Sequence, residues 1–135
     1  MHTRSTWLAI AATALLTAVP AVGADPALGL MDDLDRGLWE LRLRDAPGRT
    51  DRICLTNGIR LIQLRHPGQP CERVVVQSGS TSVTVQYTCR GLGYGRTAIR
   101  RESSRLVQVQ SQGIAEGLPF EISGEARRIG DCPGS

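Results

Sequence analysis

Lysine is absent from this sequence, and aromatic residues are scarce. All 16 residues counted as Lys or Arg are arginines, and against 13 acidic residues they give a formal net charge of +3 at pH 7. Phenylalanine occurs once, tyrosine twice and tryptophan twice. Proteins that bind single-stranded nucleic acid stack the bases on aromatic side chains within a strongly basic groove. The sequence offers neither feature, which argues against a nucleic-acid partner.

Long apolar runs are also missing. The run from Trp7 to Val19 is too short for a helix that spans a bilayer, which needs about 20 apolar residues. It follows a basic start and precedes small residues at 22–24, which is the layout of a secretory signal peptide. We therefore expect residues 1–24 to be a signal peptide that is removed. The remaining chain would have no stable membrane span and would be periplasmic or secreted.

The rest of the chain has the length of one domain. Residues 25–36 are acidic and only loosely apolar, so we expect an N-terminal extension made of coil or one helical turn. Residues 37–135 contain no linker, internal repeat or low-complexity tract. This region is therefore predicted to be a single disulfide-linked β-domain.

Cysteine is sparse too, but its placement is informative. The chain has four cysteines, and all of them follow the predicted signal peptide. Structural zinc sites usually draw ligands from pairs about two to four residues apart, and no two of these cysteines lie that close. An even number of cysteines in a short exported chain indicates disulfides. We expect two disulfides and no metal site.

The order of the cysteines favours one pairing. Cys54 and Cys71 bracket one short segment, so we expect a local Cys54–Cys71 bond. Cys132 lies close to the C-terminus and Cys89 ends an apolar strand face, so we expect a Cys89–Cys132 bond that holds the tail. The other two pairings, including Cys54–Cys132 with Cys71–Cys89, stay open on sequence alone.

Alternation of apolar and polar residues predicts strands through most of the domain. In residues 37–44, Trp39, Leu41 and Leu43 alternate with charged residues, which is typical of a strand with one face in water. Further strands are predicted at 50–55, 73–77, 82–89, 96–102, 105–112 and 119–129. Short links imply that neighbours pair antiparallel. The expected fold class is mainly β: an antiparallel meander sheet of six or seven strands, curled or closed into a small sandwich or barrel-like shape. One short helix and two disulfides complete it.

The segments between strands carry two further predictions. Thr56 or Asn57 is expected to cap a short helix that ends by Leu64. Residues 91–95, GLGYG, are expected to form a loop, because a phosphate-binding loop needs a helix after it and a strand pattern follows here.

The hairpin between the third and fourth predicted strands also has an expected register. If Gly79 and Ser80 form a two-residue turn, Val76 lies opposite Val83. The apolar residues of the 82–89 strand would then share one face, which would point to the core.

No residue pattern supports a catalytic site or a cofactor. His66 lies in RHPG, a turn-like stretch, and we expect it on the surface. A Ser-His-Asp unit needs an acid that orients the ring and a serine within reach, and no such motif accompanies His66. Glu40, Glu121 and Glu125 are expected on polar strand faces, where carboxylates are solvated rather than paired for glycoside chemistry.

Two pairs of consecutive arginines are the strongest candidates for ligand binding. Successive residues of a strand point to opposite faces, so one arginine of each pair is directed toward the core side. We expect structural ion pairs there, with an anion site at the mouth of the sheet as the sharpest binding hypothesis. Tyr94, in the glycine-rich loop, is a further candidate contact. The candidate ligand-binding residues are Arg100, Arg101, Arg127, Arg128 and Tyr94.

Several ordered anchors resemble a known family. They are GLWE at 37–40, CLT at 54–56, single cysteines at 71 and 89, and RRIGDC at 127–132. Together they resemble the bacterial exported family called domain of unknown function 3617 over nearly the whole chain after residue 24. The resemblance implies a small antiparallel β-domain in the periplasm with its four cysteines paired, and it implies no activity. Between Arg44 and Arg52 the chain departs from the family pattern, in which a longer, Met-rich stretch is common.

These observations predict a small secreted or periplasmic protein that serves as a non-catalytic binding or structural module of the cell envelope. Its partner would be an envelope protein or a small ligand, and it would need no cofactor. Two other classes stay open. One is a small periplasmic enzyme that uses carboxylates and arginines at the sheet mouth. The other is a secreted hydrolase inhibitor, which would suit the small size and the two cross-links.

Overall fold

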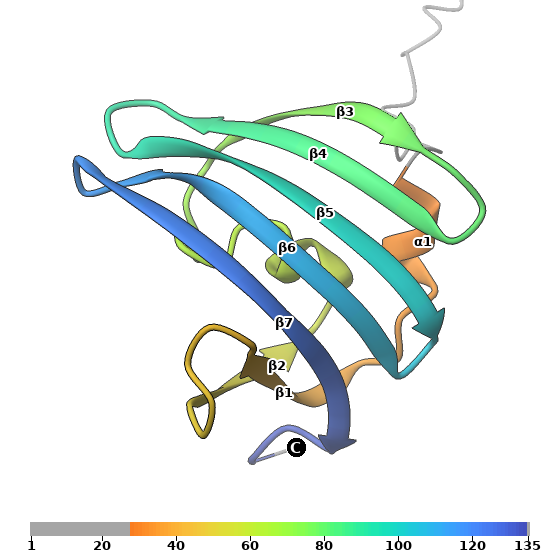
Figure 1. Cartoon of the computed structure of the whole chain (residues 1–135). Helices are drawn as coiled ribbons and strands as arrows, with labels where there is room; N and C mark the ends of the chain where they lie inside the picture. The colour runs from red at the N-terminus through yellow and green to blue at the C-terminus, as the bar shows by residue number, and fades with distance from the viewer. Residues whose placement is uncertain (1–27, 135) are drawn as a thin grey trace, which may run out of the picture.

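The chain folds into one antiparallel sheet of seven strands with two short helices (Figure 1). The computed structural model describes residues 28–134, so the predicted signal peptide lies outside the described residues. The helices are α1, Gly29–Asp32, and the 3-10 helix η2, Gly58–Leu61. The strands are β1 Gly37–Leu43, β2 Thr50–Leu55, β3 Glu72–Ser78, β4 Ser82–Cys89, β5 Gly93–Ser103, β6 Leu106–Ala115 and β7 Leu118–Gly130. The predicted fold class is confirmed.

The strand order brings the first and last strands of the chain together within one open sheet. It is β2-β1-β7-β6-β5-β4-β3, so β3 to β7 form a meander and the β1–β2 hairpin pairs with the far side of β7. The first and last strands are therefore neighbours. The connection from β2 to β3, residues 56–71, must pass from one edge of the sheet to the other. We call it the crossing segment.

The crossing segment lies on the concave side of the curved sheet, and Figure 1 shows η2 within the curve. The Asn57 side chain accepts a hydrogen bond from the N–H of Ile59 at 3.1 Å, so the cap of η2 is Asn57, one of the two predicted candidates. Leu61 and Ile62 are completely buried. A sheet must bury its apolar face against another layer, and in this protein the second layer is the chain's own crossing segment.

The core between these two layers is mainly aliphatic. On β4, alternation places Val83, Val85, Tyr87 and Cys89 on the concave face, as predicted, and each is at most 2 % exposed. Trp39 of β1 and Tyr87 are its largest fully buried side chains. Complete burial of an aliphatic or aromatic side chain stabilises the fold by roughly 1.5–3 kcal/mol.

The segment before β1 also contributes to the core. The sequence placed it in an N-terminal extension, and it contains the single helical turn α1. Met31 is completely buried and Leu34 is 6 % exposed, and both belong to the same cluster as Trp39. The apolar residues of this segment, Leu30, Met31 and Leu34, are therefore part of the core.

The predicted disulfide pairing is wrong. The bonds are Cys54–Cys132 and Cys71–Cys89, with Cα–Cα distances of 5.5 and 4.2 Å. Cys54 and Cys71 are close in sequence, but they lie at opposite edges of the sheet because the crossing segment separates them. Cys89 pairs with Gly93, and Gly93 pairs in turn with Ala115, which pairs with Leu118 at the start of β7. Cys132, by contrast, follows the end of β7. The 13 residues of β7 span roughly 40 Å, far beyond the reach of a disulfide.

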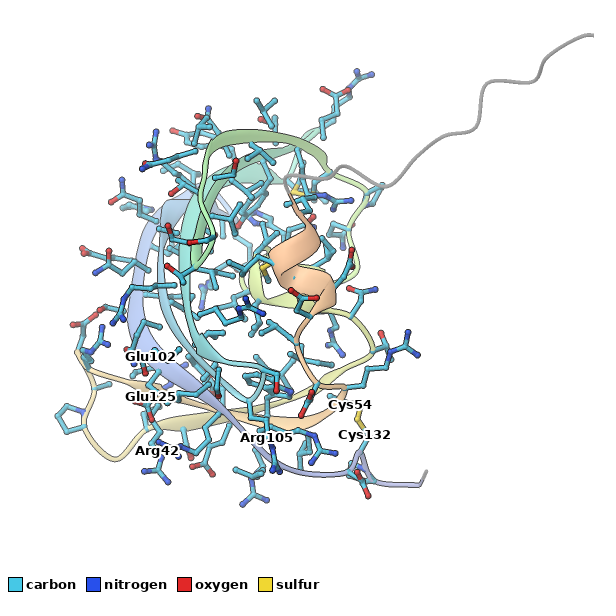
Figure 2. All side chains as sticks on the ribbon, turned by 90° about the vertical axis from the view of Figure 1, so that its right-hand side faces the viewer. Arg42, Cys54, Glu102, Arg105, Glu125 and Cys132 are labelled. Carbon is cyan, nitrogen blue, oxygen red and sulfur yellow. A yellow bond between two sulfur atoms is a disulfide. The ribbon has the colours of Figure 1, made fainter. Side chains whose placement is uncertain are left out.

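The C-terminal tail is nevertheless held by a covalent bond, as expected. Leu38 of β1 pairs with Cys54 on one side and with Gly130 on the other. The tail therefore has to cross only the end of β1 to reach β2. Figure 2 shows the Cys54–Cys132 bond at this end of the molecule.

The predicted register of the β3–β4 hairpin is also wrong. Ser78 pairs with Val83 and Val75 with Val85, so four residues lie between the last paired positions instead of two. A β-bulge between Val75 and Gln77 accommodates Val76, which is 43 % exposed. The bulge shifts the pairing and interrupts the regular hydrogen-bonding pattern of an edge strand, which discourages pairing with other chains.

Candidate ligand-binding cleft

The first half of β7 has a neighbouring strand on one side only. β1 pairs with β7 from Gly124 to Gly130 and then turns away into its hairpin with β2 after Leu43. Residues 118–122 of β7 pair with β6 alone among the described strands. The sheet is therefore open on its concave side between β7, the β1–β2 hairpin and the crossing segment.

A cleft of about 440 Å³ lies at this opening. Its volume falls in the range of about 300–1,000 Å³ that is typical of small-molecule sites. The lining consists of Leu41, Leu43, Arg49, Asp51, Ile53, Leu64, Arg65, Pro119, Phe120, Glu121 and Ile122. Leu41 belongs to the buried core, so the floor of the cleft is continuous with the core.

The apolar walls of the cleft are only half-buried. Leu43, Ile53, Leu64 and Ile122 pack against the core yet stay partly exposed to solvent, and Phe120 is half-exposed as well. Covering apolar surface gains about 25 cal/mol for each Å² that is removed from water. A ligand with an apolar body would therefore gain free energy by filling this hollow.

The β2 wall carries two opposite charges. Asp51 lies opposite Leu41 and Ile53 lies opposite Trp39, so both face the concave side. Arg49 continues this row, because its carbonyl accepts a hydrogen bond from the N–H of Leu43. Arg49 and Asp51 are both exposed and form the rim of the cleft on this side.

The opposite rim is formed by Arg65 of the crossing segment. Its guanidinium carbon lies 5.8 Å from the centroid of the Phe120 ring. This is the geometry of a cation–π contact. The contact holds the positive charge of Arg65 at the edge of the apolar wall.

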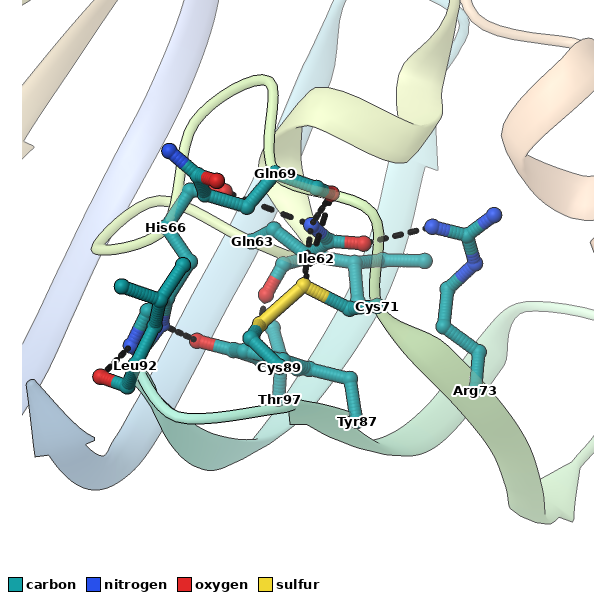
Figure 3. The surroundings of a disulfide bond; sticks show 10 residues. All are labelled: Ile62, Gln63, His66, Gln69, Cys71, Arg73, Tyr87, Cys89, Leu92 and Thr97. Atoms are coloured by element: carbon teal, nitrogen blue, oxygen red, sulfur yellow. Dashed lines mark hydrogen bonds between the residues drawn. A yellow bond between two sulfur atoms is a disulfide. The ribbon is translucent and has the colours of Figure 1, made fainter.

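Behind Phe120 lies a buried histidine, with ring centroids 6.3 Å apart. His66 is 4 % exposed, so the prediction that it lies on the surface is wrong. Its Nε2 is 3.2 Å from the carbonyl oxygen of Leu92, and its Nδ1 is 3.1 Å from the hydroxyl of Tyr87 (Figure 3). A carbonyl can only accept, so Nε2 carries the proton, and Nδ1 accepts the hydrogen bond from Tyr87.

Tyr87 is kept as a neutral hydrogen-bond donor. Burial raises its pKa to about 12, and the nearby positive charge of Arg65 opposes part of that shift. A Cβ on Gly95 would lie 2.5 Å from the Tyr87 hydroxyl oxygen, so the ring needs the bare backbone of β5 beneath it. The prediction that GLGYG, residues 91–95, forms a loop is only partly correct, because β5 already begins at Gly93.

The Cys71–Cys89 disulfide lies near His66, and Figure 3 shows the amide of Gln63 next to Cys71 and Gln69. The Gln63 amide nitrogen donates to the carbonyl oxygens of His66 at 3.3 Å and Gln69 at 3.2 Å, and it lies 3.1 Å from Sγ of Cys71. One buried amide thus anchors the end of the crossing segment.

A second polar anchor lies deeper in the core. The Thr97 hydroxyl donates to the carbonyl oxygen of Ile62 at 2.6 Å, and the Ser111 hydroxyl, 2.7 Å away, therefore donates to Thr97. Every buried side-chain nitrogen or oxygen in the described part of the chain has a hydrogen-bond partner. Because an unpaired buried polar group costs about 1–3 kcal/mol, these bonds hold the crossing segment in one position on the sheet.

The structure does not bring the four candidate arginines together. Arg101 and Arg128 lie on the concave side, opposite Val107 and Trp39, and their side chains are 27 % and 17 % exposed. The other member of each pair points to the convex side and is more than half exposed. Successive arginines thus point to opposite faces of the sheet, as the alternation predicted, and this separates the two members of each pair.

The concave arginines bind nearby groups of the chain. Arg101 contacts the Asp33 carboxylate at 3.1 Å, and Arg128 donates to the carbonyl oxygen of Arg36 at 2.7 Å and contacts Asp131 at 2.6 Å. Both carboxylates are exposed to solvent. These contacts fit structural ion pairs, each worth about 0–1 kcal/mol at such exposure. A ligand-binding role for these arginines stays a prediction.

On the convex side, the arginines form ion pairs with carboxylates of the same strands. Arg100 pairs with Glu102 at 3.1 Å and Arg127 with Glu125 at 3.2 Å. Figure 2 shows Glu102 and Glu125 close together near Arg42, on the polar side of the sheet. Of the carboxylates predicted on polar strand faces, Glu125 thus pairs with Arg127, and Glu40 pairs with Arg42 at 2.9 Å.

Tyr94 also lies on the convex side, away from the arginine pairs. It is 52 % exposed and pairs with Ile114. It lines a hollow of about 570 Å³ together with Arg96 and Pro119, and this hollow is more open to solvent than the cleft on the concave side. Tyr94 as a ligand contact stays a prediction.

Sequence reasoning missed the cleft, His66 and Gln63. One signal was present: the stretch from 56 to 71 is longer than most connections of a compact domain and contains the apolar LIQL run. The sequence predicts a helical turn that lies on the sheet here, and the length of the stretch indicates that the whole segment forms a layer over the sheet. That reading would have placed Leu64 and His66 on the concave face.

Two general features of residues 28–134 complete the description of the site. No helix in this part of the chain is long and apolar enough to cross a bilayer. It also contains no group of three or more His, Cys, Asp or Glu side chains that could hold a metal ion.

No family model, curated protein or solved structure matches the chain. The resemblance to the family called domain of unknown function 3617 therefore stays a prediction.

Proposed function

We propose that this chain is a secreted or periplasmic, non-catalytic binding protein that holds a small apolar ligand in the cleft beside β7. The half-buried walls of the cleft carry the proposal, because Leu43, Leu64 and Phe120 meet in one hollow next to the core. His66 and Tyr87, which could transfer protons, are instead used in buried hydrogen bonds behind the cleft wall. The two disulfides, the signal-like start and the family resemblance support export.

Titration with N-phenyl-1-naphthylamine, a neutral dye that fluoresces in apolar surroundings, tests the proposal. The purified protein should bind the dye saturably, with micromolar affinity. Leu43→Trp, which fills the cleft with a larger side chain, should abolish binding. Val74→Trp is the matched control, because Val74 is 63 % exposed on β3 and lies outside the cleft.

The two variants decide where the dye binds. Both should keep the near-ultraviolet circular dichroism of a folded protein, apart from the added tryptophan. If the unmodified protein shows no saturable fluorescence, or if Leu43→Trp binds the dye as well as Val74→Trp does, the cleft is not the binding site and the proposal is wrong.

A further inference from the structure

We infer that the ligand is an amphipathic anion, in which an apolar chain fills the cleft and the negatively charged group lies at the rim, where Arg49 and Arg65 attract it. This inference rests on the proposed function, since it names the chemical class of the ligand for the same cleft. It differs from an anion site at Arg101 and Arg128, because those guanidiniums already bind groups of the chain.

Arg49 and Arg65 keep their side-chain donors unused. Within residues 28–134, neither guanidinium donates a hydrogen bond or forms an ion pair with the chain. A guanidinium offers five N–H donors in a planar fork, and this fork matches the oxygens of a carboxylate or phosphate. Two such forks at the rim of one cleft favour a ligand that carries an anionic group.

The position of Arg65 indicates where that group would lie. Leu64 lines the apolar wall, and the next residue places its charge over the Phe120 ring, 5.8 Å from the centroid. A chain that lies along Leu64 and Phe120 would reach the guanidinium as it leaves the hollow. The charge of Arg65 also acts inward, since it lowers the pKa of Tyr87 against the larger effect of burial.

The balance of charge on the rim favours an anion over a cation. Asp51 lies next to Arg49 in the row that faces the cleft. Glu121 lines the cleft too, but alternation along β7 directs its side chain to the convex face, because Phe120 and Ile122 occupy the concave one. The charged side chains that face the cleft are thus two arginines and one aspartate, which leaves one net positive charge.

Displacement of N-phenyl-1-naphthylamine by decanoate and by decanol tests the inference. The two molecules share one alkyl chain and differ in the head group, and at about pH 8 the carboxylate is fully ionised. Decanol is the less water-soluble of the two, so hydrophobicity alone would favour it. We expect decanoate to displace the dye at roughly tenfold lower concentration. A decyl phosphate arm shows whether the rim prefers a phosphate to a carboxylate.

Neutral substitutions on the rim separate this effect from a general attraction to a basic protein. Arg49→Gln and Arg65→Gln should each weaken displacement by decanoate roughly three- to tenfold and leave displacement by decanol within about twofold. Arg90→Gln is the matched control, since it removes the same charge from an exposed arginine outside the cleft.

The outcomes distinguish the two proposals. If the dye binds but decanoate displaces it no better than decanol, the anion inference is wrong and the apolar cleft stands. Equal loss of decanoate binding in Arg90→Gln and Arg65→Gln also overturns the inference, because the effect would then come from overall charge. If the dye does not bind the unmodified protein, both proposals fall.

Discussion

The hydroxyl of Tyr87 donates a hydrogen bond to Nδ1 of His66 across 3.1 Å inside the core. The other ring nitrogen of His66 donates to the carbonyl oxygen of Leu92, in the turn before β5. One imidazole ring thus joins the crossing segment to β4 and to the turn that follows it. The same ring contacts Phe120 and so supports the wall of the cleft.

His66→Ala should therefore destabilise the protein more than a surface substitution would. It removes the buried partners of the Tyr87 hydroxyl and the Leu92 carbonyl and leaves a cavity. We expect a loss of about 2–4 kcal/mol in the free energy of unfolding, measured by urea denaturation. Arg90→Gln, on the surface, should change it by less than about 0.5 kcal/mol. A loss for His66→Ala no larger than the control's would mean that water replaces the ring at no cost.

The raised pKa of Tyr87 predicts a loss of stability in alkali. Its pKa is about 12 in the folded protein, against 10.0 for an ordinary tyrosine, so the folded state holds the phenol proton more tightly. Its contribution to stability is complete below about pH 10 and is lost as the pH rises from about 10 to 12, by at most about 2–3 kcal/mol. Urea denaturation between about pH 9 and pH 11.5 measures this loss.

Tyr87→Phe provides the reference for that titration. The variant lacks the ionising hydroxyl and should show a smaller decline in stability over the same pH range, although it starts about 1 kcal/mol less stable. Parallel curves for the two proteins would show that the decline comes from other groups and that folding does not raise the pKa of Tyr87.

The strands could be predicted from sequence because their signal is local. Residues such as Trp39, Leu41 and Leu43 alternate with charged neighbours, and this period of two survives in the structure as buried and exposed faces. Asn57 as a helix cap was equally local, since its side chain bonds the N–H two residues later. Both predictions needed no knowledge of the distant chain.

The long-range features could not be predicted in the same way. The sequence gives no indication that β1 pairs with β7, and that pairing decides which cysteines meet and where the sheet stays open. His66 was placed on the surface because its RHPG stretch favours a turn. The turn is present, but it faces the sheet, where Tyr87 supplies a hydrogen-bond donor from 21 positions away. The cleft combines side chains from four separate stretches, so no local pattern marks it.

The disulfide connectivity predicts unequal losses when either bond is removed. The Cys54–Cys132 bond closes a loop with a sequence separation of 78, and the Cys71–Cys89 bond one of 18. In the chain-entropy model, these loops are worth about 4.5 and about 3 kcal/mol. The double substitution C54S/C132S should therefore destabilise the protein more than C71S/C89S, as measured by urea denaturation.

Proteolytic digestion without reduction gives an independent check of the pairing. Mass spectrometry should find Cys54 peptides joined to Cys132 peptides, and Cys71 peptides joined to Cys89 peptides. Peptides that join Cys54 to Cys71 would contradict this strand arrangement, since those cysteines lie on opposite edges of the sheet.

Gly95→Ala tests the close packing of Tyr87 on β5. The new Cβ would lie 2.5 Å from the Tyr87 hydroxyl oxygen, so the ring would have to shift and weaken its bond to His66. We expect a loss of about 1–3 kcal/mol, visible as a lower melting temperature. Gly130→Ala is the control, because a Cβ there meets no atom within 4 Å. Similar melting temperatures for both variants would show that the ring moves aside without cost.

The bond between Cys54 and Cys132 also changes how the molecule would respond to mechanical force. A pull applied to the two ends of the described chain would pass from β2 to the tail through the sulfur atoms and bypass the residues between them. Strands β3 to β7 would then carry no load, and only β1, β2 and the segment before them could unravel. Stretching a single molecule before and after reduction should show a large gain in extensible length once the thiols are free.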